Sequence, residues 1–142
     1  METKRYKPLI DKMFYIISIP TILLMAILTA ICAMDHITLV SVIFVDILVI
    51  YLIVSPLFGY VELRENEVFV KFGLCNSRKI PYDTIRGVKK DRKFYSESMV
   101  SLKNAIEHVN IKYNSFDVTT VSVVDNDGFI EELKERCKKD LQ

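Results

Sequence analysis

Two long apolar stretches near the amino terminus constrain this chain more than any other feature. Residues 13–34 carry no charge, residues 37–57 carry one, Asp46, and only Asp35 and His36 separate the two stretches. At about 1.5 Å of rise per residue, a helix of this length spans about 32 Å, close to the roughly 30 Å of a bilayer's hydrocarbon core. The pattern therefore predicts two transmembrane helices joined by a tight turn.

Two other interpretations of these stretches fit less well. A soluble helix pair needs a polar face on each helix or a large partner domain, and neither stretch has a polar face. A cleaved signal peptide has an apolar core of about 7–15 residues. Here the first stretch is longer and a second one follows at once. We therefore expect a membrane hairpin that stays part of the protein.

The basic residues beside the two stretches predict the orientation of the hairpin. The positive-inside rule assigns basic flanks to the cytoplasm. We expect a cytoplasmic tail at 1–12, transmembrane helices at 13–34 and 37–57, and a cytoplasmic domain at 58–142, in a multi-pass protein of the plasma or inner membrane. The turn has no Lys or Arg, whereas the flanks carry Lys4, Arg5, Lys7 and Lys12 before the first stretch and Arg64, Lys71, Arg78 and Lys79 after the second.

The three cysteines agree with this location. Cys32, Cys75 and Cys137 are far apart in the chain and belong to different expected elements. Widely spaced, unpaired thiols suit a reducing compartment, and their spacing matches no metal site.

From residue 60 onward the apolar residues recur with a period of two, which is typical of strands with one buried face. Strands are expected at 58–64, 67–72, 78–82, 84–92, 107–113 and 116–124, whereas 94–105 has no clear pattern. Asn114 and Ser115 form the expected two-residue hairpin turn. A final helix begins at Asp125 or Asp127 and places Phe129, Leu133 and Cys137 on one face. This is an α+β protein, with an antiparallel β-barrel or sandwich and a carboxy-terminal helix behind the hairpin.

An ordered set of short segments points to a family. Residues 60–63, 68–73, 78–85, 105–113, 121–122 and 125–133 resemble bacterial pleckstrin-homology-like (PH-like) domains of small membrane proteins, which have one or two membrane spans in front. The resemblance implies a PH-like barrel, but not phosphoinositide binding. Some proteins of this build are linked with self-immunity to membrane-active peptides. The chain has His108 where the family tends to have Arg, and Val123 where it tends to have Pro.

Asp46 lies near the middle of the second predicted span. A carboxylate there costs about 2.5–3.5 kcal/mol, so we expect it to be protonated or paired. Folding the hairpin about residue 35 places Asp46 level with Leu24, which makes Thr21 a candidate hydrogen-bond partner. One hypothesis is a functional role: contact with a polar group on a partner protein, contact with a second copy of the chain, or a proton-coupled role. The other is a structural bond to Thr21 or Ser18 within the hairpin.

A basic cluster follows in the predicted strands. Set against Asp83 and Asp91, it gives a net charge of +5 between residues 78 and 93. One hypothesis is contact with anionic lipid headgroups at about 1 kcal/mol per basic residue. The other is a solvated strand face that prevents edge-to-edge pairing. The cluster comprises Arg78, Lys79, Arg86, Lys89, Lys90, Arg92 and Lys93.

No catalytic, metal or cofactor motif is present. His36 and the expected outward-facing His108 are isolated, and 15 basic against 14 acidic residues after residue 57 argue against a nucleic-acid partner. We therefore expect that the protein is not an enzyme. The leading hypothesis is a membrane-anchored PH-like interaction module on the cytoplasmic face that contacts a protein partner or anionic lipid, with protection of the membrane as one version by analogy. The alternative is an accessory subunit of a transport or channel assembly that oligomerises through the hairpin around Asp46 and Thr21.

Overall fold

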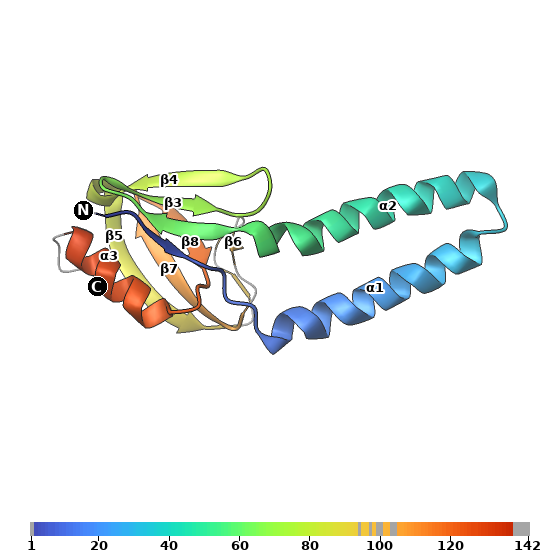
Figure 1. Cartoon of the computed structure of the whole chain (residues 1–142), viewed down its shortest axis with the longest axis horizontal. Helices are drawn as coiled ribbons and strands as arrows, with labels where there is room; N and C mark the ends of the chain where they lie inside the picture. The colour runs from blue at the N-terminus through green and yellow to red at the C-terminus, as the bar shows by residue number, and fades with distance from the viewer. Residues whose placement is uncertain (1, 94, 97, 99–100, 103–104, 138–142) are drawn as a thin grey trace.

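The computed structural model describes residues 2–93, 95–96, 98, 101–102 and 105–137. A long helical hairpin extends from one end of a two-sheet sandwich, as Figure 1 shows. The hairpin comprises α1 (Lys12–Cys32) and α2 (His36–Val54), and the short 3₁₀ helix η1 (Ser55–Phe58) continues α2. Both helices are long and apolar enough to cross a membrane, and the rest of the chain covers almost none of their surface.

Local hydrogen bonds begin each helix of the hairpin. The Asp11 carboxylate accepts from the backbone N–H of Lys12, the first residue of α1, at 2.6 Å. The Asp35 carboxylate accepts from the backbone N–H of Thr38 at 3.2 Å and from the Thr38 hydroxyl, so it caps α2. These bonds also hold the pKa of Asp35 below its ordinary value. Asp35, between the two apolar stretches, therefore has a structural role as the cap of the second helix.

The first sheet contains the strands that flank the hairpin in the sequence. Its order is β1 (Lys4–Tyr6), β2 (Tyr60–Leu63), β3 (Glu67–Lys71) and β4 (Ser77–Pro81), and every pair is antiparallel. Within β1 and β2, Lys4 lies opposite Leu63 and Tyr6 opposite Val61. The hairpin is thus an insertion between two neighbouring strands of one sheet.

The second sheet has the order β5 (Ile85–Arg92), β7 (Glu107–Tyr113), β8 (Asp117–Val121) and β6 (Ser101–Leu102), and the short 3₁₀ helix η2 (Tyr82–Thr84) leads into it from β4. The pair of β6 with β8 is parallel, and the other pairs are antiparallel. The two sheets remain separate, so the predicted α+β fold is confirmed as an unclosed sandwich. Apart from β6, the segment 94–105 lies largely outside the described residues.

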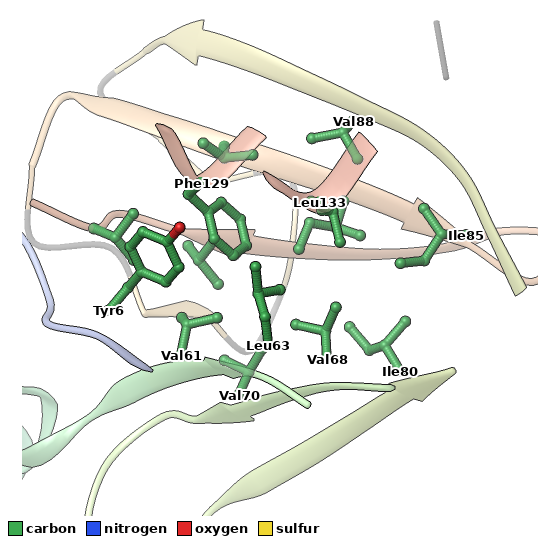
Figure 2. Packing of buried hydrophobic residues seen from close by; sticks show 14 of the residues in the cluster. Tyr6, Val61, Leu63, Val68, Val70, Ile80, Ile85, Val88, Phe129 and Leu133 are labelled. Atoms are coloured by element: carbon green, nitrogen blue, oxygen red, sulfur yellow. The ribbon is translucent and has the colours of Figure 1, made fainter. Parts of the chain in front are cut away.

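The core lies between the sheets and under the final helix. Figure 2 shows Val61, Leu63 and Val68 of the first sheet facing Phe129 and Leu133 of α3 (Asn126–Cys137). All five side chains are fully buried. The predicted cap is confirmed, since the N–H of Gly128 donates to Asp125 Oδ1 at 3.0 Å. The three predicted inward residues of this helix, Phe129, Leu133 and Cys137, are buried.

Two local features differ from the expectations. The β7–β8 turn has three residues, since Tyr113 pairs with Asp117, and Asn114 adopts a left-handed conformation (φ 52°). Asn tolerates that conformation better than most residues. Lys4–Tyr6, within the segment 1–12 assigned to a cytoplasmic tail, forms a strand of the domain. Three residues, two of them charged, are too few to show a period of two.

Candidate functional site

The domain joins α2 without a flexible linker. Only Gly59 separates η1 from β2. The β3–β4 turn at 72–76 lies against the same helix end, where the N–H of Leu74 donates to Ser55 Oγ at 3.1 Å. Gly73 lies so close to Ser55 that a Cβ at this position would overlap its hydroxyl. The end of α2 and this turn therefore form one packed unit.

The other root of the hairpin, the segment before α1, is held by the residues that follow β8 of the second sheet. The N–H of Leu9 donates to the carbonyl of Ser122 at 2.9 Å, and the N–H of Val124 donates to the carbonyl of Lys7 at 3.1 Å. Pro8 and Val123 form the bridge between these bonds. Both helices consequently leave the same end of the sandwich (Figure 1).

The end of the domain beside the helix roots forms a surface that we call the helix-side rim. We define it by residues that lie at or next to the helix roots in the chain and in the β3–β4 turn: Lys7, Lys12, Phe58, Lys71 and Leu74. Leu74 is 48% exposed and Phe58 is 56% exposed, so apolar and basic groups lie together at this end. Of the rim residues, Lys71 and Leu74 come from the β3–β4 hairpin, which sequence reasoning did not connect with the helix roots.

The predicted basic cluster is divided by the structure. Arg78 and Lys79 lie on β4 of the first sheet, whereas the other five lie on or just after β5 of the second. Arg78 Nη1 donates to the hydroxyl of Tyr113 at 2.5 Å. Arg86 lies beside Ile85, which pairs with Tyr113 next to the β7–β8 turn, at the end of the sandwich away from the hairpin.

Two members of the cluster have acidic partners. Lys90 Nζ lies 2.6 Å from Glu107 Oε1 and 2.9 Å from Asp127 Oδ1, and these hydrogen bonds raise the pKa of Lys90. Lys93 Nζ lies 3.0 Å from Asp91 Oδ2, and its hydrogen bond lowers the pKa of Asp91. Lys79, Arg86, Lys89 and Arg92 are exposed. The cluster is therefore several separate groups rather than one patch, and its role stays a prediction.

The outer face of the first sheet carries a buried acid between two arginines. The Glu62 side chain is 9% exposed and accepts from Arg5 at 2.5 Å and from Arg64 at 3.1 Å. Burial alone would raise the pKa of Glu62, but the hydrogen bonds from both arginines outweigh burial and lower it. Arg5 also lies 4.3 Å over the ring of Tyr60, and Arg64 lies 4.1 Å over Phe69. This arrangement depends on β1, which the sequence pattern did not predict.

Arg136 on α3 ties three segments together. Its side chain is 5% exposed. Nη1 donates to the carbonyl oxygens of Leu63 and Arg64, and Nη2 donates to that of Glu2 at 2.7 Å. Nε donates to Glu132 at 2.8 Å and lowers the pKa of that carboxyl group. Arg136 therefore has a structural role where α3 meets the end of β2 and the amino-terminal segment.

Asp46 has a different partner from the predicted one. Its Oδ2 lies 2.5 Å from Thr29 Oγ1, whereas the Thr21 hydroxyl donates to the carbonyl of Ile17 in its own helix. The prediction assumed helices that start level at the turn. Thr29 lies in the last turn of α1, but Asp46 lies about three turns into α2, so the helices are offset along their axes. They also separate toward the domain (Figure 1), which removes Thr21 from reach.

His108 is buried, although alternation assigns it to the outer face of β7. It is fully inaccessible, and its Nδ1 donates to the carbonyl of Ile106 at 2.9 Å. Its Nε2 has no hydrogen-bond partner among the described residues. Asn110 and Thr120, which share this face, are also buried and are bonded to each other at 2.7 Å. Alternation indicates which face a residue is on, but not whether that face is covered.

The described residues contain no group of three or more His, Cys, Asp or Glu side chains that could hold a metal ion. The model of the bacterial PH domain family matches residues 59–137. No curated protein and no solved structure matches the chain. PH domains are typically non-catalytic interaction modules. Because the match covers more than half of the sequence and agrees with the observed sandwich and final helix, this chain belongs to the bacterial PH domain family.

Proposed function

We propose that α1 and α2 cross the membrane with both chain termini in the cytoplasm, and that the PH domain is an interaction module held against the cytoplasmic surface. The basic flanks and the strongly apolar character of both helices support this topology. The observation that carries the proposal is the linker-free junction, in which both helix roots are hydrogen-bonded into the sandwich. Such a junction fixes which surface of the domain meets the bilayer.

We propose anionic lipid headgroups as the first ligand of this module. The helix-side rim supplies Lys7, Lys12 and Lys71, and each basic residue near an anionic surface contributes about 1 kcal/mol. Leu74 and Phe58 can enter the interface between headgroups and acyl chains, because they lie at the same level as the helix roots. The basic cluster predicted from the sequence supports this less, since its members are divided between the two sheets.

The experiment uses the full-length chain in vesicles of purely zwitterionic lipid or with about one third anionic lipid. Amide hydrogen exchange is followed in the β3–β4 turn. We expect slower exchange in the anionic vesicles, and we expect high salt to reverse it because headgroup attraction is screened. Lys7→Gln, Lys12→Gln and Lys71→Gln together should abolish the difference.

The matched control removes the same number of charges elsewhere. Lys79→Gln, Arg86→Gln and Lys89→Gln together should leave the lipid-dependent protection unchanged, because these residues lie outside the rim. Equal exchange in both kinds of vesicle would reject lipid as the ligand. A protein partner on the cytoplasmic side would then be the remaining form of the proposal.

A further inference from the structure

A groove along the hairpin contains the one acidic residue within α1 and α2. The groove has a volume of about 530 Å³, and Asp46 and Thr29 line it together with apolar side chains. Ala26 and Ala30 of α1 and Ala33, the residue that caps it, also line the groove, at spacings that place them on one side of the helix. Small residues in such positions let a further helix approach closely within a membrane.

The hydroxyl of Thr29 reaches two acceptors but has a single proton. Its Oγ1 lies 2.9 Å from the carbonyl oxygen of Met25 and 2.5 Å from Asp46 Oδ2. When Thr29 donates to Asp46 Oδ2, that oxygen accepts, and the proton of a neutral carboxyl group then lies on Oδ1. Hydrocarbon favours the same neutral form, because an isolated charge there is costly.

The other carboxyl oxygen of Asp46 is left open. Oδ1 has no hydrogen-bond partner among the described residues, which include both helices in full. Acyl chains have neither donors nor acceptors and leave that oxygen unsatisfied. The groove therefore favours an occupant that brings a polar group to the depth of Asp46.

We propose that the groove binds the hairpin of a second copy of this chain, so that two Asp46 carboxyl groups meet across a twofold axis. An axis along the membrane normal keeps each residue at its own depth, so Asp46 faces its equivalent. A neutral carboxyl group both donates and accepts, which makes this pair self-complementary. Neither helix has a Lys, Arg or His at this depth that would serve instead. The inference rests on the membrane-spanning part of the proposed function.

The test counts subunits of the full-length chain in vesicles by single-molecule photobleaching over a range of protein-to-lipid ratios. Wild type and Asp46→Asn should form dimers, because an amide also donates and accepts. Asp46→Leu removes the polar pair and Ala30→Phe fills the groove. Each should need about tenfold more protein per lipid to dimerise. Leu24→Phe, on a side chain that is 58% exposed and does not line the groove, is the matched control and should behave as wild type.

Monomeric wild type at every ratio would overturn the proposal, as would Asp46→Leu and Ala30→Phe dimerising as readily as Leu24→Phe. Thermal unfolding of the PH domain in each variant shows whether the chain is folded. If Asp46→Leu does not fold, the dimerisation of Ala30→Phe tests the proposal instead. Alkaline extraction of membranes separates the two proposals. Release of the chain would overturn both, whereas a monomer that resists extraction overturns only the pairing.

Discussion

At the scale of single residues, two buried charged groups hold the edges of the sandwich. Arg136 joins α3 to the end of β2 and to Glu2, and Glu62 joins β1 to β2 through Arg5. Removing one partner of a buried charged contact leaves the other uncompensated, which makes these contacts sensitive to mutation. Both groups connect segments more than 50 residues apart in the chain.

Glu62 should give the stability of the domain a dependence on acid pH. Its pKa in the folded chain lies below the ordinary 4.5, so its contribution is complete above that value and is lost as the pH falls through the folded-state pKa. Glu62→Gln should cost about 1 kcal/mol at neutral pH, a modest value because Arg5 is largely exposed. The substitution should also reduce the loss of unfolding free energy as the pH falls, which we call the acid limb of the stability curve. Thermal unfolding of the full chain in detergent between about pH 3 and pH 7 measures both effects; an unchanged acid limb would contradict the assignment.

At the scale of elements, β1 decides whether the PH domain is complete. The family match begins at residue 59, after the hairpin, but Lys4–Tyr6 pairs with β2 and buries Tyr6 to 7% exposure. The Tyr6 ring lies 5.2 Å from that of Phe129 in an edge-to-face arrangement. A segment on one side of the hairpin therefore completes the sheet and the core formed on the other side.

A domain without the hairpin tests this directly. Residues 2–7 joined to residues 60–142 by an Asn-Gly turn should fold as a soluble domain, because Tyr6, the last residue of β1, pairs with Val61 near the start of antiparallel β2. Residues 60–142 alone should be less stable by about 3 kcal/mol, the scale of losing a buried aromatic side chain. Urea unfolding measures the difference. In the joined domain Tyr6→Ala should cause most of this loss, whereas the exposed Lys4→Ala should change little; equal stability of both chains would mean that β1 is dispensable.

At the scale of the whole molecule, membrane and cytoplasmic parts act as one body in the proposed topology. The hairpin is inserted between paired strands, and its two roots are held by the β3–β4 turn and by the segment after β8. A tilt of one helix relative to the other would therefore strain the β1–β2 pair. In the proposed topology the α1–α2 turn and the β3–β4 turn lie on opposite sides of the bilayer.

Cysteine labelling tests this topology. In the chain with Cys32→Ser, a membrane-impermeant maleimide should label Met34→Cys in intact cells, because Met34 is 94% exposed in the α1–α2 turn. Native Cys75, exposed in the β3–β4 turn, should be labelled only after the membrane is opened. Labelling of Cys75 in intact cells would reverse the proposed orientation.

The two apolar helices, most strands and the final helix follow from local patterns in the sequence. Length and lack of charge predict helices at 13–34 and 37–57, which the structure has at 12–32 and 36–54. Alternation identifies the strand 107–113 with its boundaries as observed. The Asp125 cap and the buried face of α3 follow from short-range spacing. These features can be predicted locally because apolar residues on the buried face of a helix recur about every 3.6 residues, and those of a strand every two residues.

The tertiary structure alone decided the pairing and burial that join distant segments. Lys4–Tyr6 became a strand because β2 supplies a partner edge, and Thr29 replaced Thr21 beside Asp46 because the helices are offset. His108 is buried although its position in the strand alternates outward, and acidic neighbours surround Lys90. A side chain's own neighbours in sequence specify its direction. What it meets there depends on segments that the fold brings from elsewhere in the chain.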